Sequence, residues 1–477
     1  MKHIKAYFIG MAVVSAVFSA NAQQASRTAY FLDGYSYRHE LNPALGGERN
    51  YFSIPVLANI GIGLQSNVGV NTFLYKSTVQ GYDLTTFMSP SVSADEFLGK
   101  LGKYNHVNAN LNLTLLSTGF KAFGGFNTIS AGVRTEVGVV IPKELFEFMK
   151  LGQTGPDTRY SFENLQANAS AMAEIELGHS RAINEKLNIG AKLKFLLGVG
   201  NVNAKINRMD VRLSNSQWSI DAEGELNAAA GSGLSIPTKQ EIGAEYDTPA
   251  EADQIEWGNI KYNSFGLSGF GMAVDLGATY KLLPDLTLSA AVLDLGFIGW
   301  SNNIKGRTSA EPWTFEGFKD VAIMEDQDDY EEKKLSQQID DMIDGIEDMI
   351  NFHRIETGGK HNQMLHATIN LGAEYCMPFY RNLTAGFLFT QYIAGCSSWT
   401  EGRFSANVKP VKWFDATVSY GASTYGSSFG WMLNFHPKGF NFFIGSDHQF
   451  FKVTPQFVPV GHATAAINLG FNVTFGS

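Results

Sequence analysis

The sequence has no long apolar run. After the first 22 residues, no window of about 18 residues is apolar and free of charge, so we expect no membrane-spanning helix. Charged residues make up only 17% of the chain, below the roughly 25% of soluble domains. Aromatic residues make up 13%, and there are 49 glycines. This composition, without apolar helices, is typical of a transmembrane β-barrel.

A basic stripe is also missing, which argues against nucleic acid as a partner. The formal net charge is −10, and residues 325–348 carry 11 acidic side chains against Lys333 and Lys334, so one loop holds most of the imbalance. Apolar residues recur at helical spacing there, which predicts an amphipathic helix over 325–352. We expect a solvated helix face rather than a site for cations or for a basic partner.

Cysteine is scarce, and motifs of catalysis are missing. Cys376 and Cys396 fall at opposite ends of a predicted hairpin, too far apart for a disulfide, so we predict two free thiols. We find no Gly-x-Ser-x-Gly elbow, phosphate loop or metal-ligand spacing, and predict no enzyme, no metal and no cofactor. A hydrolase assembled across strands stays open; it needs acids beside His436 or His448, and none is in register.

The N-terminus is typical of an exported protein. Lys2, His3 and Lys5 precede an apolar stretch, and Ala20-Asn21-Ala22 is a small-x-small cleavage site. We predict a cleaved signal peptide over 1–22, with no cysteine behind it for a lipid anchor. Residues 23–59 precede the first predicted strand, and we expect them to form a plug at the periplasmic end of the barrel.

The dominant pattern is period-two alternation in segments of about ten residues, which is typical of strands with one lipid face and one lumen face. In the last segment, apolar residues from Ala465 to Phe475 alternate with small or polar ones. Such segments predict an all-β antiparallel barrel of about fourteen strands over 60–477. They are 60–75, 105–116, 127–140, 164–178, 186–206, 263–280, 286–298, 364–376, 383–392, 399–408, 413–421, 428–436, 439–446 and 463–475.

Alternate connections are short and long, as a barrel with brief periplasmic turns requires. Short turns such as 283–285 and 437–439 carry Pro or polar residues. The outward set includes 76–104 and 141–163, the second with a short helix predicted over 143–150. The two longest outward loops are 207–262 and 299–363, and the acidic helix lies in the latter.

Several charged residues fall on the predicted lumen face. They either line a polar permeation path or pair across strands to satisfy the interior, and we expect the second. Asp294 falls where the alternation breaks, which predicts a bulge that re-aims a lumen side chain or ends the pairing; we expect the end of pairing. The lumen-facing charges are Arg134, Glu136, Glu174, Glu176, Lys192, Lys194 and Asp275.

The C-terminus matches the pattern of a last strand read by the barrel-assembly machinery. Asn468, Gly470, Val473 and Phe475 occupy the polar, glycine and apolar positions of that pattern. A lipid-facing terminal strand with aromatic ends, eased into curvature by a glycine, is the physical reason for it. We predict that these four residues form the insertion signal.

Two resemblances follow from these residues. Segments 190–200, 269–280 and 293–300 resemble an uncharacterised family of Bacteroidota outer-membrane barrels, a domain of unknown function, over almost the whole mature chain. More distantly, Asn42-Pro43-Ala44 resembles a stretch beside the plug of the long-chain fatty-acid transporter (FadL-like) superfamily. That likeness implies fourteen strands, a plugged lumen, helix-bearing outward loops, and hydrophobic ligands that leave sideways through a strand kink. The acidic helix departs from that family, so no ligand residue is carried over.

We therefore expect an outer-membrane barrel for passive transport of a small hydrophobic ligand, surrounded by outer-membrane lipid. The alternative is a surface scaffold without transport, whose acidic loop contacts a partner or a glycan. The sequence leaves the ligand and the oligomeric state open.

Overall fold

The computed structural model describes residues 26–53, 58–79, 83–231, 234–246, 251–262, 266–309, 312–316, 351–448 and 465–476. The predicted signal peptide and all but the last two residues of the predicted helix 325–352 lie outside these ranges. Within them, no helix is long and apolar enough to cross a membrane.

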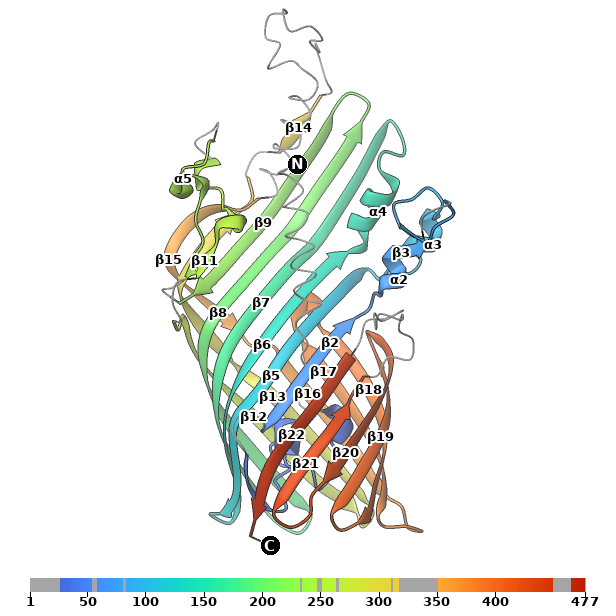
Figure 1. The fold of residues 1–477 in the computed structure, drawn as a ribbon, viewed down its shortest axis with the longest axis vertical. Helices are drawn as coiled ribbons and strands as arrows, with labels where there is room; N and C mark the ends of the chain where they lie inside the picture. The colour runs from blue at the N-terminus through green and yellow to red at the C-terminus, as the bar shows by residue number, and fades with distance from the viewer. Residues whose placement is uncertain are drawn as a thin grey trace, which may run out of the picture.

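Fourteen antiparallel wall strands close into a barrel, as predicted (Figure 1). The first is formed by β1 (Asn50–Ser53) and β2 (Asn59–Ser66), and it pairs with the last strand, where Ile60 faces Leu469. The other strands are β5 (Tyr104–Ala122), β6 (Gly125–Pro142), β7 (Asp157–Ala182), β8 (Leu187–Ser214), β12 (Gly269–Leu283), β13 (Leu286–Arg307), β15 with β16 (His353–Met364, Ala367–Cys376), β17 (Leu383–Ile393), β18 (Trp399–Val411), β19 (Phe414–Ser423), β20 (Gly426–Phe435), β21 (Phe440–Ser446) and β22 (Ala465–Phe475).

Side-chain alternation explains why these segments form the wall. In β22, Ile467 and Val473 are 40% and 43% exposed on the outer surface, whereas Asn468 and Asn472 are fully buried in the interior. Apolar residues face outward in the same way on β12 and β13, where Leu276 and Leu295 are exposed. The outer surface therefore suits lipid, and the lumen is polar.

The barrel has a short-turn end, which holds the C-terminus, and an extended end (Figure 1). β7 and β8 have 26 and 28 residues, far more than the 9–11 or so that span a membrane. The predicted loop 207–262 was therefore wrong in part: β8 continues to Ser214 and β9 (Trp218–Ala230) returns beside it. The predicted loop 299–363 likewise contains the end of β13, almost all of β15 and the short β14 (Trp313–Phe315).

Small elements cover the extended end. β10 (Leu234–Ser235), β11 (Lys261–Tyr262), α5 (Lys239–Ile242), η3 (Glu251–Asp253) and η4 (Trp257–Asn259) lie after β9. An apolar core that includes Phe162, Met209, Leu226 and Phe352 joins these elements to the extended strands. A second outer unit contains α2 (Val70–Phe73), β3 (Leu74–Lys76), β4 (Leu84–Thr86) and α3 (Ala94–Leu98), packed around Phe97.

Three further expectations can be compared with these elements. The helix predicted over 143–150 is confirmed as α4 (Lys143–Leu151). Cys376 and Cys396, the second in η5 (Gly395–Ser397), are both free, as predicted. The boundary at 59/60 was wrong, because β1 already lies in the wall from Asn50, and the strand ends at Ser66 rather than at residue 75.

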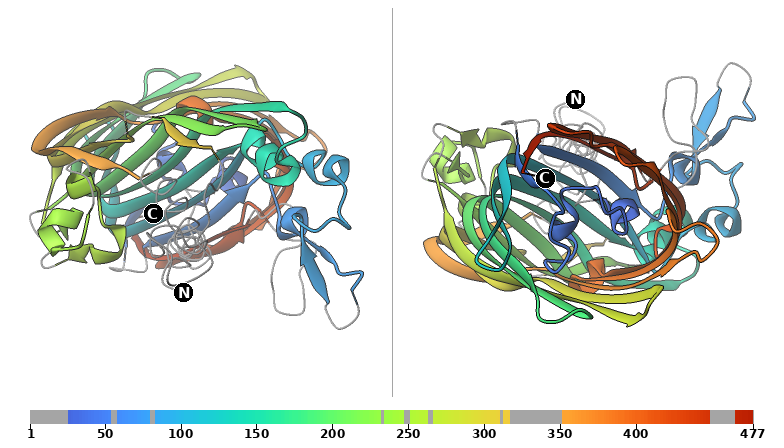
Figure 2. Two further views of the ribbon diagram at one scale, coloured as in Figure 1. Left: turned by 90° about the horizontal axis from the view of Figure 1, so that it is seen from above. Right: turned by 90° about the horizontal axis from the view of Figure 1, so that it is seen from below.

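Residues 26–49 lie inside the ring of strands, and we call this segment the plug (Figure 2). It contains two 3-10 turns, η1 (Arg27–Ala29) and η2 (Arg38–Glu40). Its aromatic residues Tyr35 and Tyr37 pack with Phe443 and Met432 of the wall into a buried cluster. The plug is therefore held by apolar contact as well as by the polar contacts described next.

Candidate functional site

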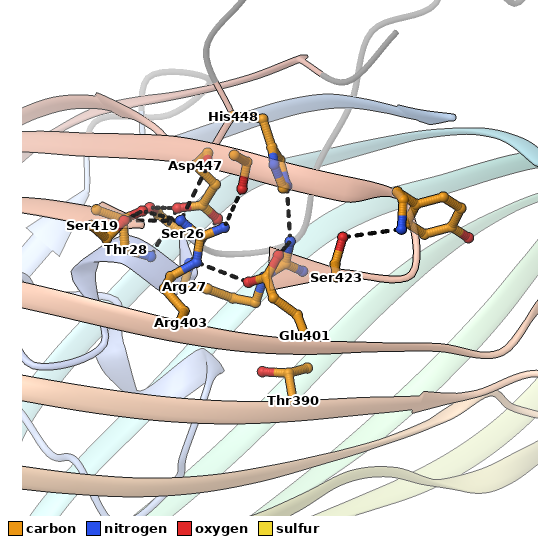
Figure 3. Close-up of polar contacts among 12 residues, drawn as sticks. Ser26, Arg27, Thr28, Thr390, Glu401, Arg403, Ser419, Ser423, Asp447 and His448 are labelled. Carbon is orange, nitrogen blue, oxygen red and sulfur yellow. Dashed lines mark hydrogen bonds and ion pairs between the residues drawn. The ribbon is translucent and has the colours of Figure 1, made fainter. Parts of the chain in front are cut away.

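The plug is fixed to the wall at Arg27 by buried charges (Figure 3). The Arg27 guanidinium and that of Arg403 both donate to Glu401 Oε1, at 3.0 and 2.8 Å. Asp447 accepts from the backbone N–H groups of Arg27 and Thr28, both at 2.8 Å. Arg27 also lies 4.7 Å from the centre of the Trp399 ring. Glu401 and both arginines are almost fully buried, so each depends on the others for charge compensation.

A second set of contacts fixes the middle of the plug. The Gly34 N–H donates to Asp415 at 3.0 Å, and Ser36 Oγ donates to Asn441 at 2.9 Å. The Tyr37 hydroxyl donates to Asn472 of β22 at 2.8 Å. The plug therefore contacts the wall on β19, β21 and β22.

The predicted motif Asn42-Pro43-Ala44 lies against the opposite wall. Asn42 is fully buried, donates to the Tyr30 hydroxyl at 3.0 Å, and accepts from the Ala44 N–H at 2.9 Å. Gly277 of β12 and Gly190 of β8 are register partners in these neighbouring strands, next to the motif. A Cβ on Gly277 would lie 2.0 Å from Asn42 Oδ1, and one on Gly190 would lie 2.2 Å from the Pro43 carbonyl oxygen. The two glycines therefore permit this contact, and no local sequence pattern marks them for it.

His39 of the plug is buried beside Tyr51, with 2.9 Å between its Nε2 and the Tyr51 hydroxyl. Burial, together with the nearby Lys192, lowers the pKa of the His39 imidazole to about 3. The ring is therefore neutral at physiological pH, and the contact with Tyr51 is a neutral hydrogen bond.

Above the plug, the seven predicted lumen charges lie together with Asp294, and we call these eight residues the charge network. Arg134 lies 3.0 Å from both Glu174 and Asp294. Lys194 lies 2.7 Å from Asp294 and 2.9 Å from Asp275. The remaining pairs are Lys192 with Glu176 at 2.8 Å, Arg134 with Glu136 at 3.8 Å and Lys194 with Glu176 at 3.9 Å. The side chains thus satisfy one another across five strands.

The bulge predicted at Asp294 is present, but the expectation that it ends the pairing was wrong. Asp294 has a φ of 58°, and the register with β12 shifts there and then resumes at Leu295. On its other side, β13 changes its partner from β16 to β15. The bulge therefore turns the Asp294 carboxylate into the lumen, where Arg134 and Lys194 meet it.

A cavity lies between the charge network and the extended end. The centres of water molecules can occupy about 90 Å³ of it. We call it the lumen chamber. Its lining includes carboxamides from β2, β5, β7 and β8 and from the end of β15. They are Gln65, Asn108, Asn110, Gln166, Asn168, Asn201, Asn203 and Gln363. A similar cavity lies below it, bordered by the plug and the charge network.

Two apolar residues of the chamber lining, Met172 and Ile298, belong to a buried cluster that extends to Trp300. Met172, Leu196, Ile298 and Trp300 are all buried and form one cluster, which we call the apolar patch. The Trp300 indole packs against the backbone of Gly198 in the wall. A side chain would not fit there, because a Cβ on Gly198 would lie 2.4 Å from the indole ring. Its Nε1 donates to Gln363 at 3.1 Å.

The outer surface carries a groove of about 510 Å³ at the same place, lined by Leu197, Leu267, Phe270 and Trp300 among others. Here β8 changes its partner from β12 to β9, and β12 begins at Gly269. Trp300 belongs to the apolar patch and also lines the groove, so among the described residues its ring connects the two.

The expectation that no acid lies beside these histidines was wrong for His436, whose Nε2 lies 3.4 Å from Asp415. The His448 ring lies 3.0 Å from the Arg27 guanidinium, which pairs with Glu401. Both histidines contact residues that hold the plug: Asp415 also accepts from the Gly34 N–H, and Glu401 is paired with Arg27. In the described part of the chain, no group of three His, Cys, Asp or Glu residues could hold a metal ion.

The predicted insertion signal lies on β22. Asn468 and Gly470 face inward, where Gly470 leaves room for Phe443 and for the Ala58 carbonyl. Val473 and Phe475 are exposed on the outer surface. The arrangement has the inward and outward faces that the predicted pattern requires.

Residues 43–447 match the model of a family described as "Family of unknown function (DUF5723)". The chain belongs to this family. Membership of a family of unknown function was predicted and is confirmed. No curated protein matches the sequence.

Solved structures that are similar to this DUF5723 member include the P. putida toluene transporter TodX, at 8% identity over 91% of each chain and a TM-score of 0.36. The Ralstonia pickettii toluene transporter TbuX is similar at 10% identity, over 96% of this chain and 98% of that one, with a TM-score of 0.38. A Pseudomonas aeruginosa FadL homologue is similar at 11% identity, over 96% and 99%, with a TM-score of 0.36.

Proposed function

We propose that this protein resides in the outer membrane and passes small, largely apolar molecules through it by passive diffusion. The observation that carries the proposal is the wall at Trp300, where the apolar patch and the outer groove lie back to back. A ligand would enter from the extended end, occupy the chamber and leave past Trp300 into the lipid. The plug closes the short-turn end, which would face the periplasm.

The position of the groove supports this route. Gly269 is fourteen residues from the short turn at Leu283, slightly more than a membrane-spanning strand. The groove would therefore open at the outer edge of the lipid bilayer. A ligand that leaves there would bypass the polar surface of the outer membrane, and no energy source is needed for such a step.

A variant at Trp300 tests the route. We would measure influx of the uncharged apolar dye N-phenyl-1-naphthylamine into lipopolysaccharide-containing proteoliposomes, whose surface slows apolar solutes. Trp300→Ala should accelerate influx relative to wild type, and Trp413→Ala, an exposed tryptophan at a short turn, should not. Trp300→Leu serves if the alanine variant does not fold. Influx equal to that of protein-free vesicles for every protein would contradict the proposal.

A surface scaffold without transport remains the second candidate. It is favoured by the strands β7, β8 and β9, which continue beyond the barrel and carry an apolar core of their own. A deletion of residues 203–227 that leaves dye influx unchanged but abolishes attachment of cells to a partner surface would support it.

A further inference from the structure

The lumen chamber is lined by hydrogen-bonding groups, and one of them has no partner in the described part of the chain. Asn110, Asn168 and Asn203 line the chamber from β5, β7 and β8. Asn201 lines it too and is 3% exposed; its Nδ2 has no hydrogen-bond partner in the described part of the chain. A buried amide donor without a partner costs free energy. The chamber is therefore suited to contents that accept hydrogen bonds, and the oxygens of its carboxamides suit contents that also donate them.

The charged groups at the chamber are already paired. Arg27 binds Glu401, and Arg134 lies against Glu136, Glu174 and Asp294. The charge network holds three cationic and five carboxylate side chains, so it is formally negative. Among the described residues, an anion would meet this formal negative charge and find no unpaired cation there. An uncharged polar group meets neither obstacle.

The carboxamides and the apolar patch meet in the same cavity. Met172 and Ile298 line the chamber together with Asn168 and Asn201. A wholly apolar ligand would cover these amides without replacing their hydrogen bonds, and a wholly polar one would leave the apolar part of the chamber lining, which includes Met172 and Ile298, without an apolar partner. Hydroxyl groups both donate and accept, as carboxamides do. A ligand with hydroxyls at one end and hydrocarbon at the other satisfies both surfaces.

We infer that the lumen chamber binds the uncharged, hydroxyl-rich head of an amphipathic molecule, whose hydrocarbon chain lies on the apolar patch toward Trp300. By its volume the chamber holds about six to nine water molecules, and thus a head on the order of one sugar ring. This inference rests on the proposed function, because it names the ligand class that would use the same route.

Equilibrium dialysis of the full-length protein in lipid nanodiscs tests the ligand class. The probes are hexyl β-glucoside, hexanoate and glucose, each with empty nanodiscs as the blank. We expect hexyl β-glucoside to bind at least tenfold more tightly than either hexanoate or glucose, because only it has both the uncharged head and the chain. Equal affinity for hexanoate would overturn the inference, and so would equal affinity for glucose.

Two variants place the bound head in the chamber. Asn168→Leu/Asn203→Leu removes two carboxamides at nearly constant volume, and should weaken hexyl β-glucoside binding about tenfold while sparing hexanoate. Asn259→Leu, at an exposed carboxamide in η4, is the matched control and should change nothing. Unchanged hexyl β-glucoside affinity in a folded double variant would place the binding elsewhere and overturn the inference.

The two proposals can fail separately. If the dye enters in a Trp300-dependent manner but hexyl β-glucoside does not bind, the ligand class is wrong and the route stands. If hexyl β-glucoside binds as described but the dye never enters, the chamber is a binding site and the transport proposal fails.

Discussion

Neutralising Glu401 should release the plug. Glu401→Gln keeps the shape of the side chain but leaves Arg27 and Arg403 buried beside each other without its negative charge. Removing one partner of a buried ion pair costs about 3–5 kcal/mol. Water can reach both guanidiniums once the plug leaves, so the cost falls on the docked state. The population with a released plug should therefore rise roughly 150- to 5,000-fold.

Single-channel recording in planar bilayers measures this population. Wild type should be closed for nearly all of the record, and Glu401→Gln should show frequent openings as large as those of a variant that lacks residues 26–45. Asp157→Asn is the matched control, because Asp157 also joins two arginines, Arg159 and Arg212, but at an exposed site. Such surface pairs contribute about 0–1 kcal/mol, so this variant should behave like wild type.

The same assay can refute the reasoning. Folding of each variant is checked by its heat-modifiable mobility on a gel. If folded Glu401→Gln is as closed as Asp157→Asn, the buried charges do not hold the plug. Arg27→Met/Glu401→Met should recover much of the closed state, because the double variant removes both charges of this buried pair and leaves the plug with no uncompensated cation.

Three further predictions follow from the packing. Asp294→Asn should lower the free energy of unfolding in urea by about 3–5 kcal/mol, against at most about 1 kcal/mol for Asp285→Asn at an exposed pair; equal losses would contradict a structural charge network. Gly277→Ala should displace Asn42 and increase channel opening, whereas Gly402→Ala, with no contact shorter than 3.6 Å, should not; matching open probabilities would refute the glycine argument. A hydrogen bond from Arg354 holds the pKa of Glu241 below its usual value, so the pair stabilises α5 above about pH 4.3 and is lost as pH falls through the lowered pKa. Amide exchange in α5 should then accelerate at pH 3 relative to the intrinsic rate, and a constant protection factor would be inconsistent with this.

The barrel was predictable from the sequence because alternation is a local signal. β22 shows it directly, since its apolar residues are the exposed ones and its asparagines are buried. β9 carries the same signal, with Trp218, Ile220 and Leu226 alternating with charged residues. β9 was not predicted as a strand because the residues between its apolar ones are charged, whereas we looked for uncharged polar residues of a lumen face. Charged residues suit a strand that lies beyond the membrane.

The plug anchors could not be predicted in the same way. Arg27 meets Glu401 across 374 residues and Asp447 across 420, and no local pattern reports such a pairing. The glycines under Asn42 and over Trp300 are similar cases, because a wall glycine shows its purpose only when its neighbour across the wall is known. Asp294 was recognised as a break in alternation, but the direction of its side chain depends on the partners that receive it.

The most direct test of transport compares two solutes in one preparation. Lipopolysaccharide-containing vesicles with the wild-type protein and vesicles without it would be given N-phenyl-1-naphthylamine and glucose. We predict faster entry of the dye into the protein-containing vesicles and no difference for glucose, because the plug closes the short-turn end. Dye entry at the same rate with and without the protein would contradict the transport proposal.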